Sequence, residues 1–279
     1  MPPAGPLASF ERPRNPEGAA FWTRVALFAG LGLVLRLFVI ASIPTQPVSD
    51  FWEYFQRAES IVRPGPPQQI PGVTDAGHPP AYPLALAAFM LFVTPHLLAA
   101  KLANCALAVS TIAIGAGLAR DLGGRRCGIA AAILFSFYPR LLLMPLLLAS
   151  ENLFSPLLLL FVWAAVKRWR TGASLRLAAV AGILIGLAAL TRSIGYFLPL
   201  VWLAGTVAAR ARLRTILAEL MLMLAVEHGV MFPWAIHNTR TTGRFTFLSS
   251  LGGIGLYIGN NPRATGDWYD WTSDLERAR

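Results

Sequence analysis

Long apolar runs separated by short charged turns limit what this chain can fold into. The first run, residues 21–42, is long enough to cross about 30 Å of hydrocarbon as a helix. It exceeds the apolar core of a usual signal peptide and begins later in the chain, which favours an uncleaved membrane anchor. Apolar residues make up 55% of the chain and charged residues 14%, which excludes an ordinary soluble domain. The pattern predicts an all-α polytopic membrane protein.

Further apolar runs predict the remaining membrane spans, about seven in all. They are residues 97–119, 127–148, 152–166, 175–190, 194–209 and 213–236. Residues 81–93 are short for a crossing and predict a surface or re-entrant helix.

Basic residues gather in turns that this pattern places on one side of the membrane. They are Arg120, Arg125 and Arg126; Lys167, Arg168, Arg170 and Arg176; and Arg210, Arg212 and Arg214. The positive-inside rule assigns these turns to the cytoplasm, with anionic lipid headgroups as their partners. Membrane orientation therefore accounts for most of the +10 net charge, and nucleic acid is excluded as a partner.

The same pattern divides the chain into three parts. Residues 1–20 are predicted to be a flexible cytoplasmic tail, residues 21–236 a transmembrane domain, and residues 237–279 an outer segment that is incomplete. Within the last part, "RFTFLS" at 244–249 alternates like a β-strand.

The first outer loop, residues 44–80, contains the amphipathic stretch "VSDFWEYFQRAESIV". As a helix it has one apolar and one polar face, which predicts a juxtamembrane helix lying along the interface. Asp50 fits two interpretations. It is the cap of this helix, with Glu53 completing a capping box, or a rigidly held base for an acceptor hydroxyl, and the first role does not exclude the second.

Other polar residues lie near the predicted outer ends of the spans. His78 in "GHPPAYP" is either an exposed turn residue or a ligand for an anionic group. Arg192 in "LTRS" either snorkels to lipid phosphate or binds a ligand. Glu151 is predicted to cap the helix that begins there, because the helix dipole favours an acid near its start.

Three ionisable residues fall inside predicted spans, namely Arg36, Glu227 and His228. Charges at such depth are costly unless they pair or line a wet cavity. The sequence leaves open a structural ion pair between the first and last spans or a functional role for each residue.

Short motifs along the chain occur in a fixed order and fall on the predicted outer side. They are "SDFWEY", "HPPAYPLALA", "ASENLF", "LTRS", "HNTRTTGRF" and "GGIGLYIGNNPRATG". Over residues 21–266 the set resembles the polyprenyl-phosphate-sugar-dependent glycosyltransferases of the C superfamily, which include protein O-mannosyltransferases and aminoarabinose transferases.

This resemblance implies sugar transfer, with inversion, from a polyprenyl-phosphate donor to a lipid, glycan or protein hydroxyl at the outer face of the cytoplasmic (inner) membrane. Asp50 matches the catalytic acid by position. The implied ligands of the donor phosphate are His78, Arg140, Arg192 and Arg244, and the implied substrate-binding residues are Glu53, Tyr54, Glu151, Asn260 and Asn261. The two asparagines could equally serve only to fold their loop. A divalent metal near Asp50 and Glu151 is compatible with the resemblance, but no ligand spacing requires one.

The chain is shorter than members of this superfamily usually are. The resemblance therefore implies that this chain is the first part of a longer enzyme. One way to complete such an enzyme is a second chain that supplies the missing helices. The alternative is a noncatalytic polyprenyl-lipid-binding membrane subunit or an inactive truncated copy. A transporter is disfavoured because the spans contain no evident internal repeat.

Overall fold

A computed structural model describes residues 16–63, 77–94, 96–249 and 252–264. In these ranges every regular element is helical, which confirms the predicted all-α class. The long helices are α1 (Pro16–Ser42), α4 (His96–Phe137), α6 (Glu151–Thr171), α7 (Leu175–Ala189), α8 (Leu198–Ala208) and α9 (Leu213–Thr242). The shorter elements are α2 (Asp50–Val62), α3 (Ala81–Met90), α5 (Pro139–Leu143), η1 (Met144–Leu146), η2 (Ser193–Phe197) and α10 (Gly252–Gly259).

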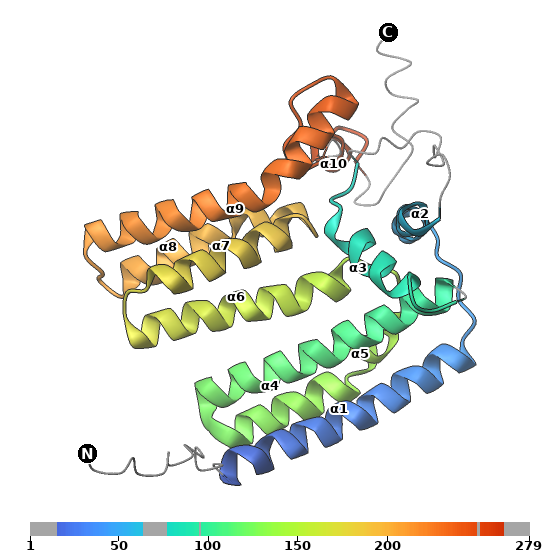
Figure 1. Ribbon diagram of the computed structural model, residues 1–279, viewed down its shortest axis with the longest axis horizontal. Helices are drawn as coiled ribbons and strands as arrows, with labels where there is room; N and C mark the ends of the chain where they lie inside the picture. Colours follow the sequence, from blue (N-terminus) through green and yellow to red (C-terminus); the bar gives the residue numbers. More distant parts are fainter. Residues whose placement is uncertain (1–15, 64–76, 95, 250–251, 265–279) are drawn as a thin grey trace, which may run out of the picture.

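The long helices lie side by side, and α2, α3 and α10 gather at one end of the bundle (Figure 1). The basic turn before α7, the basic turn after α8 and the turn within α4 lie at the opposite end. The helix directions therefore separate the predicted outer segments from the predicted cytoplasmic turns.

The helix α4 is two antiparallel limbs joined at Gly124. This residue has φ 83° and ψ −178°, a conformation that only glycine adopts readily. Figure 1 shows α4 reversing its direction part-way along its length. The limbs correspond to two of the predicted spans, but the second limb ends at Phe137. The prediction of one helix over 127–148 is thus wrong beyond Phe137, because Pro139 and Pro145 each lack an N–H, and they lie in the first turns of the short helices α5 and η1.

Helices α7 and α9 approach closely through a small residue. A Cβ atom added to Gly182 would lie 2.5 Å from the Met223 carbonyl oxygen. Within a membrane, helices associate through such close packing because lipid is as apolar as the side chains. These helices form one core with Phe161 of α6 and Trp202 of α8, both fully buried.

Three described helical segments are long and apolar enough to cross a membrane: Gly18–Ser42, His96–Phe137 and Leu213–Thr242. Shorter apolar segments are Ala81–Met90, Leu175–Ala189 and Ser193–Ala208. The chain is thus a membrane protein by length and composition, and the number of seven spans remains a prediction.

The predicted β-strand at 244–249 is wrong. These residues form a loop after α9, in which the Thr242 hydroxyl donates to the Arg244 carbonyl at 2.8 Å. A strand needs a neighbour for its backbone groups, and the described part of the chain contains no other strand. The residues 1–15 and 265–279 of the predicted terminal segments lie outside the described residues.

Of the two alternatives for the intramembrane charges, the ion pair between Arg36 and Glu227 does not form. Arg36 is 1% exposed and donates to the carbonyls of Gly32, Phe135 and Ser136 at 2.9–3.1 Å. It thereby places a cation on the carbonyl end of the second α4 limb, where the helix dipole favours it. Glu227 is fully buried, and neither carboxylate oxygen has a hydrogen-bond partner.

Candidate functional site

An open cleft at the end of the bundle brings together segments that are far apart in the sequence. It encloses about 630 Å³ and is lined by Asp50, Tyr54, Gly77, His78, Pro79, Ser150, Thr191, Arg192, Ser193, Ile194 and Ser249. Two backbone-directed bonds hold these segments together. Ala81 N–H donates to the Leu190 carbonyl at 2.9 Å, and the Ser249 hydroxyl donates to the Gly77 carbonyl at 2.5 Å.

One wall of the cleft is the start of α2. The helix buries Tyr54, Phe55 and Ala58 in a core shared with α3 and α4, which confirms its predicted amphipathic character. Ser49 precedes it with φ 52°, a region that residues other than glycine rarely adopt. This turn directs the chain so that the exposed Asp50 is the first helical residue at the cleft.

The capping interpretation of Asp50 is wrong in this structure. Ser49 occupies the cap position, and no side chain there accepts a hydrogen bond from the helix start. Glu53 does not complete a capping box, because its two oxygens bind other side chains. Among the described residues Asp50 forms no ion pair, and its nearest polar side-chain partner is Ser49 Oγ at 3.5 Å. Its carboxylate is therefore available to a ligand.

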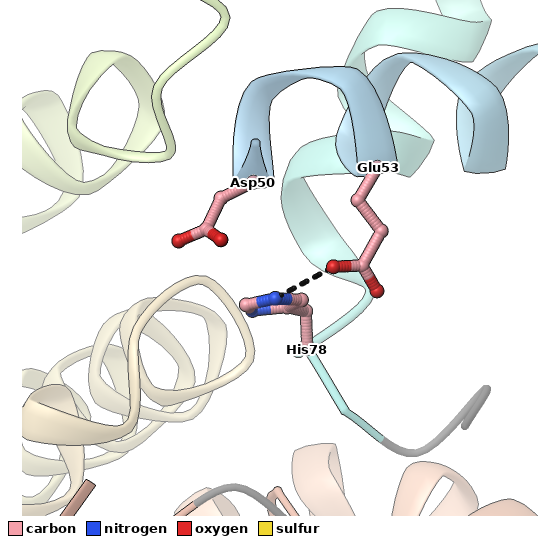
Figure 2. Close-up of side chains that lie close together, drawn as sticks. All are labelled: Asp50, Glu53 and His78. Carbon is pink, nitrogen blue, oxygen red and sulfur yellow. Dashed lines mark ion pairs between the residues drawn. The ribbon is translucent and has the colours of Figure 1, made fainter. Parts of the chain in front are cut away.

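A three-residue cluster lies beneath the start of α2. Figure 2 shows the Asp50 and Glu53 side chains on the same side of the helix, facing His78. Glu53 Oε2 lies 2.9 Å from His78 Nε2, and Glu53 Oε1 accepts from Arg57 Nη2 at 2.8 Å. Arg57 also donates to the His78 carbonyl at 3.4 Å. Glu53 thus fixes the orientation of the imidazole.

Electrostatics in this cluster favour an ionised Glu53. Burial alone would raise the pKa of this carboxyl, but hydrogen bonds and charge from His78 and Arg57 outweigh burial and hold it below its ordinary value. The Tyr54 ring packs edge-on against His78 at 5.2 Å between centroids. Burial raises the pKa of the Tyr54 phenol, and the nearby Asp50 carboxylate acts in the same direction.

The facing wall carries the cation of the cleft. Arg192 follows α7 and forms an ion pair with Glu151, the first residue of α6. Arg192 Nη1 also donates to Ser150 Oγ at 3.3 Å. The Arg192 and Glu151 side chains are 40% and 47% exposed, so a ligand in the cleft can reach both.

Two buried asparagines hold the irregular turn that ends at Glu151. Asn104 accepts from Tyr82 Oη at 2.9 Å and donates to the Leu147 carbonyl at 3.0 Å. Asn152 donates to the carbonyls of Leu147 and Ala149 at 3.0 and 2.9 Å. The asparagine amides donate to carbonyls of this turn that are not paired within a helix. These bonds fix the positions of Ser150 and Glu151.

The structure brings only some of the predicted site residues together. Asp50, Tyr54, His78 and Arg192 line the cleft, and Glu53 and Glu151 contact residues that do. The remaining predicted residues, Arg140, Arg244, Asn260 and Asn261, are not among the lining residues. Arg140 is exposed on α5 and Arg244 is exposed beyond α9. Asn260 and Asn261 each donate to carbonyls of α10, so their amides fold this loop.

Sequence reasoning missed the hydroxyl groups of the cleft. Ser150 and Thr191 are 2% and 1% exposed and lie beside Glu151 and Arg192 in motifs that were otherwise recognised. Their positions next to predicted ligands are a signal that could have identified them. Ser249 carries no such signal, because only the folded loop brings it to Gly77.

One group of side chains could hold a metal ion. Asp50, Glu53 and His78 each offer a ligand atom, and these atoms lie within 4.8 Å of one another. Glu151, expected from the sequence to share a metal with Asp50, is not part of this group.

The comparison with known families decides the identity of the domain. A family model described as dolichyl-phosphate-mannose-protein mannosyltransferase matches residues 77–237, well over half of the chain. The chain belongs to this family. Membership in this mannosyltransferase family agrees with the resemblance in the outer motifs, and the matched range includes His78, Glu151 and Arg192. Asp50 precedes that range. No curated protein matches the chain.

Proposed function

We propose that this chain transfers a sugar from a polyprenyl-phosphate donor to an acceptor hydroxyl at the outer face of the cytoplasmic membrane, with inversion and with Asp50 as general base. Family membership supports the coarser part, a membrane glycosyltransferase that uses a polyprenyl-phosphate sugar. One observation carries the finer part. The Asp50 carboxylate, which is exposed and forms no ion pair with the residues that the structure describes, lines the same cleft as the Arg192 guanidinium from a different element.

In the proposed reaction Asp50 removes the acceptor proton. The acceptor oxygen forms a bond to the anomeric carbon while the bond from that carbon to the donor phosphate oxygen breaks. The electron pair of the breaking bond goes to the phosphate, and Asp50 later releases its proton to water. Attack on the face opposite the phosphate inverts the anomeric centre. A positioned base of this kind contributes about 10²–10⁴-fold to the rate.

The departing polyprenyl phosphate gains negative charge and needs stabilisation. Arg192 supplies a fixed cation at the cleft. His78 lines the same cleft, and because Glu53 binds Nε2, the other ring nitrogen is available to the phosphate. Preorganised donors that face developing charge are often the largest contribution to catalysis. Arg140 and Arg244 are proposed only as outer contacts for the lipid phosphate, because neither lines the cleft.

The proposed topology has seven crossings: α1, the two limbs of α4, α6, α7, η2 with α8, and α9. The segregation of basic turns from the cleft supports this arrangement, with the N-terminus cytoplasmic. In this arrangement α2 lies along the outer interface and α3 does not cross. Residues beyond α9 contribute Ser249 to the cleft and belong to the outer segment.

The test measures sugar transfer and donor binding by the reconstituted chain, with and without host membrane extract. We expect Asp50→Asn to lower kcat about 10²-fold or more while donor Kd changes less than about twofold. Glu59→Gln is the matched control, because it removes a carboxylate from the same helix outside the cleft. Donor binding by the wild type without transfer, even with extract, would instead support the noncatalytic lipid-binding subunit.

A further inference from the structure

A second cavity lies at the opposite end of the bundle from the candidate site. It encloses about 970 Å³ between the turn of α4 and the facing sides of α6 and α7. The helix α6 connects the two places: Glu151 at its first residue belongs to the candidate site, and Arg170 and Thr171 at its end line this cavity. Twenty-one residues of helix span about 30 Å, so the cavity is separate from the cleft.

The lining changes character along α6. Leu160, Trp163 and Ala164 line the part toward the middle of the helix, and Lys167, Arg170 and Thr171 line the part at its end. These positions recur at helical spacing and form one stripe, so the polarity varies along the helix axis rather than around it. Val180 and Leu184 of α7 add to the apolar part. The cavity is therefore a groove with two parts. Its apolar floor consists of Leu160, Trp163, Ala164, Val180 and Leu184, and its cationic mouth contains Lys167 and Arg170.

The mouth has surplus positive charge. Asp121, its one lining acid, already pairs with Arg120 at 3.2 Å and accepts from Trp163 Nε1 at 2.8 Å. Arg170 donates to the Asp121 carbonyl, and its guanidinium forms no ion pair with the part of the chain that the structure describes. Lys167 is exposed and forms no ion pair within the described residues.

We propose that this groove binds an anionic diacyl phospholipid of the leaflet opposite the candidate site. The lipid phosphate would lie at Lys167 and Arg170, and one acyl chain would lie along Trp163, Val180 and Leu184. Charge complementarity and the orientation of the apolar floor support this occupant, because a basic pocket between membrane helices suits an acidic headgroup. Trp163 also has the amphipathic character of residues at a membrane interface.

The groove differs from the general positive charge of this end of the bundle. Arg212 and Arg214 are exposed at the start of α9 but do not line the cavity. General attraction to an anionic surface would involve these arginines as much as Lys167 and Arg170. A specific lipid site in the groove would depend on Lys167 and Arg170 and not on Arg212 and Arg214.

The experiment compares lipid retention by the purified full chain in native mass spectra. The probes are phosphatidylglycerol and phosphatidylcholine with identical acyl chains. We expect phosphatidylglycerol to be retained preferentially and the double variant Lys167→Gln/Arg170→Gln to weaken its retention about tenfold or more. The control Arg212→Gln/Arg214→Gln has the same change in charge and should alter retention less than about twofold.

A third variant tests the apolar floor. Val180→Trp places a larger ring in the groove from a position that is 40% exposed, and we expect it to reduce retention of both lipids. Equal retention of the two probes, or an equal loss in both double variants, would overturn the proposal. Unchanged retention in Val180→Trp together with a changed oligomeric state would also overturn it, because the groove would then be occupied by a second copy of the chain.

Discussion

The Arg192 guanidinium at the cleft is paired with the Glu151 carboxylate, across 41 positions of sequence and two helices. Both side chains are about half exposed, so the pair contributes less than about 1 kcal/mol to stability. Its larger effect is on ligand binding. A donor phosphate that binds Arg192 must share this cation with Glu151.

We therefore expect Glu151→Gln to tighten donor binding, with a two- to fivefold lower Kd, on the order of 1 kcal/mol or less for one exposed charge. Arg192→Gln should have the opposite effect and weaken binding at least about tenfold, because a charge-assisted contact to phosphate is lost. Titration of the purified chain with a labelled polyprenyl-phosphate sugar measures both. Weaker binding by Glu151→Gln would indicate that this carboxylate contacts the sugar directly.

The pH dependence of stability should depend on Glu53. Its pKa is lowered in the folded chain, so the ionised carboxylate stabilises the fold above its ordinary pKa, and this contribution is lost as pH falls through the lowered value. At pH 7 we expect Glu53→Gln to have a free energy of unfolding roughly 2 kcal/mol below that of the wild type, and therefore to unfold at a lower temperature. The difference should shrink toward about pH 3.

Thermal unfolding in detergent over this pH range is the measurement. Glu59→Gln is the comparison, because Glu59 lies on the same helix as Glu53 and pairs with Arg63 and with His96 of α4, but is more exposed. A Glu53→Gln variant that loses the same stability at every pH would show that packing, rather than charge, accounts for the effect.

The sequence predicted most of the helices because apolar runs and helix-ending residues are local signals. The helix α6 illustrates this, since its apolar run precedes Gly172, which has φ 93° and ends the helix. The contacts of the site were not readable in the same way. Glu53 and His78 are 25 positions apart, and nothing local to either residue indicates that they meet.

Buried charges show the same limit. An intramembrane arginine predicts an acidic partner, but Arg36 binds main-chain carbonyls at the end of another helix. Those carbonyls are unpaired only because Pro139 stops the second α4 limb. A sequence pattern therefore identifies a costly charge without identifying its partner.

The turn before α6 should depend on Asn104. This residue is fully buried and connects Tyr82 to the Leu147 carbonyl. Asn104→Ala would leave the buried Tyr82 hydroxyl without this acceptor and would remove one of the two amide donors to the Leu147 carbonyl, the other being Asn152. We expect a loss of about 2 kcal/mol together with reduced transfer activity. Tyr82→Phe removes only the hydroxyl and should cost about 1 kcal/mol. Chemical denaturation in mixed micelles measures both losses. Equal losses in the two variants would mean that the bond to Leu147 is dispensable.

The two ends of the bundle should label from opposite sides of the membrane. Ser60 is exposed on α2, at the same end of the bundle as the cleft, and Ala173 is exposed in the turn between α6 and α7. In a background with Cys127→Ser, because Cys127 is exposed whereas Cys105 is buried, a membrane-impermeant thiol reagent applied to intact cells should modify Ser60→Cys. It should modify Ala173→Cys only after the membrane is permeabilised, because the basic turns are expected to face the cytoplasm. Labelling of Ala173→Cys in intact cells would reverse the orientation. The cleft would then face the cytoplasm, where a donor presented at the outer face could not reach Asp50.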